Sequence, residues 1–85
     1  MRMIDFDRKS PMKSISLYLT PDEASQLKEE LEKLLRAPEA HEHFHIYDAK
    51  DPNREISCSI VTESKLKNLS GYNKLEQKIL ADCLS

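Results

Sequence analysis

HEHFHIYD, residues 41–48, contains all three histidines of the chain at alternate positions. Strict alternation of polar and apolar residues is typical of a β-strand with one face in a core and the other in solvent. Phe44 and Ile46 would then point into the core. The opposite face would present His41, His43, His45 and Tyr47. Pro38 and Pro52 bound this stretch, so the sequence predicts a short, half-buried strand.

Two other segments have the same period. Residues 55–61 alternate, and the polar residues 49–54 before them have the composition of a turn. This pattern predicts a β-hairpin with the histidine strand. Residues 14–19 also alternate, with Ile15, Leu17 and Leu19 on one side, and they predict a further strand near the N-terminus.

Two helices are predicted from their first turns. Thr20 is placed as N-cap, Pro21 as the first helical residue and Glu23 as the partner in a capping box. Leucines at helical spacing follow, and Pro38 disfavours continuation of this helix. Asn73 with Glu76 forms a second capping box. The apolar stripe of that second helix would be Leu75, Ile79, Leu80, Cys83 and Leu84.

The predicted fold class is α+β in the order β-α-β-β-α. A right-handed crossover would carry residues 14–19 through the first helix to a parallel histidine strand, and residues 55–61 would lie between these two. The result is a three-stranded sheet of order 1-3-2 with both helices on one face, like a ferredoxin-like unit lacking its last strand. In the alternative order, residues 14–19 lie directly beside the histidine strand.

Domain boundaries and core follow from this fold. We expect residues 1–13 to be a flexible leader, with a short edge strand as the alternative, and residues 14–85 to be a single α+β domain. The side chains expected to be fully buried are Leu17, Leu27, Leu31, Leu34, Phe44, Ile46, Ile60 and Ile79.

Composition excludes several classes of protein. A chain of 85 residues supports one modest core and no deep cleft. The net charge of −2 gives no electrostatic reason to bind nucleic acid or an anionic membrane. No apolar run approaches the roughly 20 residues of a membrane span. A single glycine rules out phosphate-cradling loops. We expect a cytoplasmic protein, similar in general character to small bacterial cytosolic α+β proteins.

Nucleophilic catalysis is not favoured either. Cys58 has the parity of the core and would face away from the histidines, so no Cys–His pair is expected. Ser57 and Ser59 come without an oxyanion-hole glycine. Cys58 and Cys83 leave a disulfide open, but buried thiols in a reducing cytosol fit their spacing better. We therefore expect no catalytic residue and no cofactor.

A metal site is the alternative hypothesis. Residues i and i+2 of a strand are about 6.6–6.8 Å apart and residues i and i+4 about 13 Å, so two neighbouring imidazoles can share an ion but three cannot. Glu55 is the carboxylate of matching parity in the next strand. A zinc or copper site would draw on His41, His43, His45 and Glu55.

The favoured prediction is a small, non-enzymatic protein-interaction or assembly module. Tyrosine supplies contact area at a low entropic cost, and serine supplies adaptable hydrogen bonds. The partner would be another protein or a second copy of this chain, as in a homodimer, and neither nucleic acid nor membrane. The predicted interaction face consists of Tyr18, His43, His45, Tyr47, Ser57 and Ser59.

Overall fold

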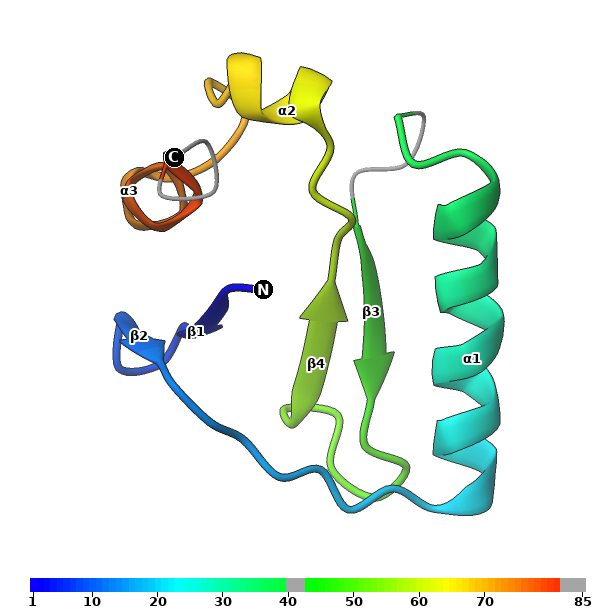
Figure 1. Cartoon of the computed structure of the whole chain (residues 1–85). Helices are drawn as coiled ribbons and strands as arrows, with labels where there is room; N and C mark the ends of the chain where they lie inside the picture. The colour runs from blue at the N-terminus through cyan, green and yellow to red at the C-terminus, as the bar shows by residue number, and fades with distance from the viewer. Residues whose placement is uncertain (40–42, 82–85) are drawn as a thin grey trace. The chain divides into compact units, whose positions relative to one another are not determined.

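The structure is a computed structural model that describes residues 1–39 and 43–81. Its elements are β1 (Met3–Asp5), β2 (Ser10–Met12), α1 (Pro21–Arg36), β3 (Phe44–Tyr47), β4 (Glu55–Cys58), α2 (Glu63–Lys67) and α3 (Lys74–Ala81) (Figure 1). The chain divides into two compact units. We call Tyr18–Thr62 the hairpin–helix unit, and Met1–Leu17 with Glu63–Ser85 the terminal unit; each is described by itself.

Helix α1 opens the hairpin–helix unit with the predicted capping box. The Thr20 hydroxyl oxygen accepts a hydrogen bond from the Glu23 N–H at 3.2 Å, and a Glu23 carboxylate oxygen accepts one from the Thr20 N–H at 2.9 Å. Pro21 lies in the first turn, where a missing N–H costs nothing. The predicted start of this helix is therefore confirmed.

Strands β3 and β4 form the predicted antiparallel hairpin. Opposite pairs are Phe44 with Cys58, His45 with Ser57, Ile46 with Ile56, and Tyr47 with Glu55. The turn is held by Asp48, whose Oδ1 accepts hydrogen bonds from the N–H groups of Lys50 and Asp51 at 2.8 and 3.0 Å. This is an Asx-type turn, as the Asp- and Asn-rich composition indicated.

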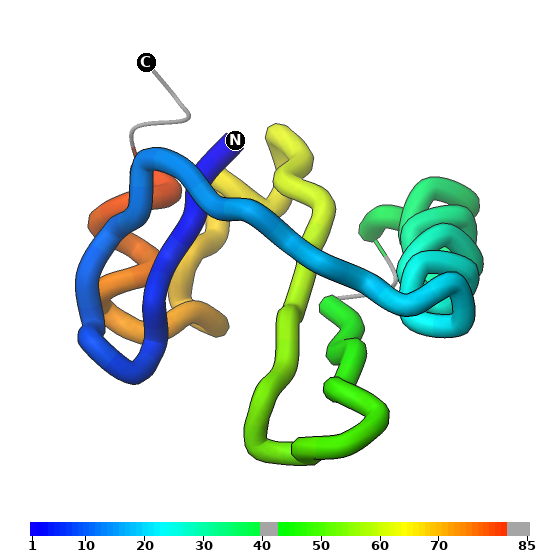
Figure 2. Tube along the Cα trace, turned by 90° about the horizontal axis from the view of Figure 1, so that it is seen from below, coloured from blue at the N-terminus to red at the C-terminus, as the bar shows by residue number. Residues whose placement is uncertain are grey.

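The core of this unit lies between α1 and the hairpin. Leu34, Phe44 and Ile46 are buried, and Leu27, Ile56, Cys58 and Ile60 pack against them while remaining partly exposed. Helix α1 packs mainly against β3. Figures 1 and 2 both place α1 beside β3, on the side away from β4. The buried Phe44 confirms the predicted register, because a slip of one residue would invert both faces.

The three-stranded sheet predicted from the sequence is wrong. The described residues form two separate two-stranded sheets, β1-β2 and β3-β4. Residues 14–19 pair with neither strand of the hairpin, so both proposed strand orders are excluded. A strand needs hydrogen bonds from a neighbour, and alternation in the sequence does not supply that neighbour. Leu17 is consequently 47% exposed.

The predicted core is correct only in part. Leu34, Phe44, Ile46 and Ile79 are buried as expected, and Leu27 and Ile60 are half-buried. Leu17 and Leu31 are exposed. Leu17 is not buried because the strand predicted for residues 14–19 is not formed. Leu31 lies on a helical stripe that is wider than the surface the hairpin covers.

The terminal unit begins with a hairpin that the sequence analysis did not predict. Strands β1 and β2 pair in antiparallel register, with Met3 opposite Met12 and Asp5 opposite Ser10. In the connecting turn, Asp5 Oδ1 accepts hydrogen bonds from the N–H groups of Asp7 and Arg8 at 3.0 and 3.1 Å. A hairpin thus lies in the stretch expected to be a flexible leader, while the domain boundary at residue 14 stays a prediction.

Helices α2 and α3 complete the terminal unit. Helix α3 has the predicted second capping box: Asn73 Oδ1 accepts from the Glu76 N–H at 2.8 Å, and Glu76 Oε1 accepts from the Asn73 N–H at 3.1 Å. Ile79 is the buried residue of this helix. Cys83 and Leu84, which were predicted to extend its apolar stripe, lie outside the described residues.

Candidate functional site: the outward face of the hairpin

Alternate residues of the hairpin point away from its core and form what we call the outward face. It consists of His43, His45, Tyr47, Glu55 and Ser57, all of which are exposed. Burial along β3 alternates strictly, with Phe44 and Ile46 buried and His45 and Tyr47 exposed. The sequence pattern therefore predicted correctly which β3 side chains reach solvent.

Three rings follow one another along this face. The ring centroids of His43 and His45 are 4.8 Å apart, with an interplanar angle of 87°. Those of His45 and Tyr47 are 6.0 Å apart and nearly parallel, at 20°. Edge-to-face and offset arrangements are the favourable geometries for aromatic pairs. The rings thus form a continuous row, and at its end the Tyr47 side chain is 51% exposed.

His45 also meets a carboxylate of the neighbouring strand. Its Nδ1 lies 3.3 Å from Glu55 Oε2, diagonally across the hairpin. Both side chains are more than a third exposed, so the pair contributes little to stability. Its effect is geometric, because it restrains the imidazole between Tyr47 and His43 and becomes an ion pair when His45 is protonated.

The metal alternative receives limited geometric support. His43 and His45 are close enough for two imidazoles to share an ion. Within residues 1–39 and 43–81, however, no group of three or more His, Cys, Asp or Glu side chains is arranged to hold a metal. Structural zinc sites take four protein ligands. His41, the remaining predicted ligand, lies outside the described residues.

Two predicted face residues are placed differently from the rest. Tyr18 is 94% exposed and precedes α1, and the strand that was expected to set it beside the histidines is not formed. Ser59 is exposed and follows the last residue of β4. The hairpin register therefore brings together His43, His45, Tyr47 and Ser57, and it does not bring Tyr18 to them.

Cys58 lies on the other side of the hairpin. It is a free, half-buried cysteine opposite Phe44. Burial raises the pKa of the Cys58 thiol, which keeps it protonated and weakly nucleophilic. Its side chain faces the core and not the histidines, as its parity predicted. Cys83, its potential disulfide partner, lies outside the described residues.

A residue whose full role the sequence analysis missed is Glu23. Beyond its capping role, its Oε2 accepts a hydrogen bond from the Ala49 N–H at 3.2 Å. Hydrogen bonds from the backbone of Thr20 and Ala49 hold the pKa of the Glu23 carboxyl below its usual range. The capping box was visible in the sequence, but a contact between residues 26 apart has no local signal.

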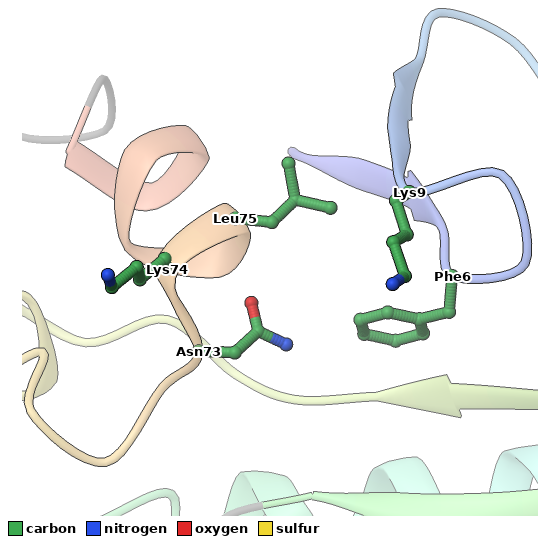
Figure 3. A pocket seen from close by; sticks show the side chains of 5 residues that line it. All are labelled: Phe6, Lys9, Asn73, Lys74 and Leu75. Carbon is green, nitrogen blue, oxygen red and sulfur yellow. The ribbon is translucent and has the colours of Figure 1, made fainter.

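The terminal unit contains a cavity of about 330 Å³. It is lined by Phe6, Lys9, Asn73, Lys74 and Leu75 (Figure 3). Figure 3 shows Asn73 and Leu75 directed toward Phe6 and Lys9, and Lys74 directed away. The Oδ1 and the backbone N–H of Asn73 are used in the capping box of α3. The sequence does not predict this cavity, because Phe6 and Lys9 lie in the stretch whose pattern indicates a flexible leader.

Comparison with known proteins adds no assignment. No family model matches the chain, and neither the curated proteins nor the solved structures give a match. Among the helices in the described part of the chain, none combines the length and apolar character that crossing a bilayer requires. The outward face therefore has to be interpreted from its own geometry.

Proposed function

We propose that this chain is a small, non-enzymatic protein-interaction module and that the outward face of the hairpin contacts the partner. The observation that carries the proposal is the row of His43, His45 and Tyr47 rings along β3. Tyrosine and histidine are amphipathic, so a row of their rings suits a contact that exchanges water for another protein surface.

The chemistry around the row also favours binding over catalysis. Cys58 faces the core, and burial raises the pKa of its thiol. Ser57 lies opposite His45, but it sits within β4. The strand context differs from the sharp strand-to-helix turn that exposes a catalytic serine next to oxyanion-hole N–H groups.

A metal-binding function is the second candidate. It is favoured by the 4.8 Å separation of the His43 and His45 rings and by the 3.3 Å approach of Glu55 to His45. Zinc or copper would be the expected ion, since imidazole suits both. Metal analysis of protein purified without a histidine tag separates the candidates: a stoichiometric metal that is lost in both His43→Ala and His45→Ala would favour this one.

Affinity capture from the native host tests the interaction function. The wild-type chain is compared with Tyr47→Ala and His45→Glu, which alter the face, and with Lys50→Ala, an exposed turn residue outside it. We expect a protein that is retained by the wild type and by Lys50→Ala and lost with both face variants. Equal capture by all four chains would contradict the proposal.

A further inference from the structure

Strand β3 has an edge that the described residues leave without a strand partner. Its sheet has two strands, so one side of β3 pairs with β4 and the other is open. The Asp48 N–H donates to the Arg54 carbonyl oxygen at 2.8 Å, which fixes the hydrogen-bonding phase of the hairpin. Since backbone groups alternate in direction along a strand, those of Phe44 and Ile46 point toward β4. The N–H and C=O groups of His45 and Tyr47 therefore point to the open edge.

The residues of the open edge lack the sequence features that usually prevent pairing. Natural edge strands are protected by charged residues, proline or bulges, or by a helix or loop that covers the edge. Residues 43–47 contain no Asp, Glu, Lys, Arg or Pro. The antiparallel register of β3 with β4 runs without a bulge. A two-stranded sheet is also short of strands for independent stability. This edge is therefore suited to receive another strand.

Helix α1 packs on the core face of β3, where Leu34 forms a buried cluster with Phe44 and Ile46, and it lies next to the open edge (Figures 1 and 2). It leaves Leu31 37% exposed and Leu35 67% exposed, one helical turn apart. The apolar stripe of α1 is thus wider than its own hairpin covers. A partner that supplied both a strand and an apolar helix would hydrogen-bond the open edge of β3 and bury Leu31 and Leu35 at the same time.

A second copy of this chain carries that combination, and its β3 is complementary to β3 itself. We infer that β3 pairs antiparallel with β3 of a second copy about a two-fold axis at His45, giving a continuous four-stranded sheet. Phe44 then lies opposite the second copy's Ile46, His43 opposite its Tyr47, and His45 opposite its equivalent. Every pair joins residues of like parity, so both cores stay on one face and both ring rows on the other. A C2 contact requires this self-complementarity.

The inference rests on the proposed function, for which it names the partner and the edge. Two proline variants test the edge: His45→Pro removes an N–H that points to the open edge of β3, and Ser59→Pro, an exposed position just after β4 and outside the outward face, is the matched control. His45→Ala keeps the backbone donor and controls for loss of the imidazole. Sedimentation equilibrium of the full chain is measured from micromolar to near-millimolar concentration.

The expected result is a dimer for wild type and Ser59→Pro, a weaker dimer for His45→Ala, which loses the ring but keeps the backbone donor, and a monomer for His45→Pro. Wild type that stays monomeric, or His45→Pro that dimerises like wild type, overturns the inference. If the wild type stays monomeric but captures a host protein, and Tyr47→Ala abolishes that capture, only this inference is overturned. If neither Tyr47→Ala nor His45→Glu affects capture or dimerisation, the proposed function is overturned.

A cross-linking measurement keeps the test decisive if His45→Pro fails to fold. In a chain with Cys58→Ser and Cys83→Ser, His45→Cys places one thiol on the two-fold axis. Hydrogen-bonded antiparallel pairs have Cα atoms about 5.5 Å apart, within the range that a disulfide spans. Mild oxidation should give a covalent dimer with His45→Cys and none with Ser57→Cys. Equal yields from the two variants would overturn the inference.

Discussion

The Glu23 carboxylate accepts the Ala49 N–H at 3.2 Å and the Thr20 N–H at 2.9 Å, so one side chain links the first turn of α1 to the turn that follows β3. Helix and hairpin are thereby joined at one end by hydrogen bonds, and the core of Leu34, Phe44 and Ile46 joins them along their length. This link holds β3 in place beneath α1 and orients the outward face toward solvent.

The first prediction concerns the N-cap that Glu23 shares. Thr20→Ala removes the hydroxyl that accepts the Glu23 N–H, and loss of such a cap costs about 0.5–2 kcal/mol. Urea unfolding followed by circular dichroism measures the change. Ser25→Ala, an exposed substitution inside α1, is the control and should leave the free energy of unfolding almost unchanged. Equal effects of the two substitutions would contradict the capping role.

The second prediction is a pH dependence of stability. The pKa of the Glu23 carboxyl is lowered from its ordinary value of 4.5 by hydrogen bonds from Thr20 and Ala49. Because the pKa of Glu23 is lower in the folded protein, its carboxylate stabilises the fold at pH values above 4.5. This contribution is lost as the pH falls through the pKa of Glu23 in the folded protein. Glu23→Gln should therefore be less stable than wild type at neutral pH, and the gap should narrow in acid. Asp48, whose pKa is lowered by the N–H groups of Lys50 and Asp51, should behave likewise as Asp48→Asn. The unfolding midpoints of wild type and both variants are measured across the acid range. A difference between variant and wild type that does not change with pH would contradict the prediction.

The third prediction tests the core. Phe44 is 8% exposed and packs with Leu34 and Ile46, so Phe44→Ala should cost about 3–5 kcal/mol. That is a large share of the stability of a domain this small. Its neighbour His45 faces solvent, and His45→Ala should cost far less. Thermal unfolding of the two variants distinguishes them, and similar losses would argue against the register of β3.

The fourth prediction concerns the turn between β1 and β2. Lys9 has φ of 53°, a left-handed conformation that costs a non-glycine residue roughly 1–2 kcal/mol. Lys9→Gly relieves this cost and should stabilise the terminal unit slightly, whereas Lys9→Val should destabilise it because β-branched residues tolerate this conformation worst. Hydrogen exchange at β1 and β2 reports the effect locally. Stronger protection of the β1 and β2 amides in Lys9→Val than in Lys9→Gly would contradict the observed backbone conformation.

The fifth prediction is that negative charge at the centre of the ring row weakens association through β3. In the pairing proposed above, two His45 side chains face each other, and Glu55 lies 3.3 Å from the imidazole on each copy. His45→Glu would place two further carboxylates opposite each other and beside Glu55, so it should raise the dissociation constant well above that of His45→Gln, which is uncharged. Sedimentation of the two variants measures the difference. Equal dissociation constants for His45→Glu and His45→Gln would exclude the two-fold at His45.

The sequence was sufficient for elements with strong local signals. The capping boxes at Thr20 and Asn73 predicted the starts of α1 and α3, and alternation from His43 to Tyr47 predicted the hairpin face. These features depend on neighbours in the chain, where hydrogen-bond spacing and side-chain period are explicit.

The sequence was insufficient where structure depends on a distant partner, or where a short element carries no recognisable local signal. Residues 14–19 have the pattern of a strand, but pairing is not encoded in the pattern. The β1-β2 hairpin has no clear signal in the sequence, because its strands have three residues each and Pro11 lies within β2. Lys9 also takes a turn position with positive φ, where a glycine would have indicated the turn. The Glu23–Ala49 contact is likewise a consequence of the tertiary fold.

The most direct test of the contact between β3 and β3 of a second copy is an NMR dilution series of the full chain, followed by backbone amide shifts. As the concentration rises, the account predicts shift changes concentrated at residues 43–47 and at Ser57 and Glu55, with little change around the cavity of Phe6 and Leu75. Changes confined to that cavity, or spectra independent of concentration, would contradict it.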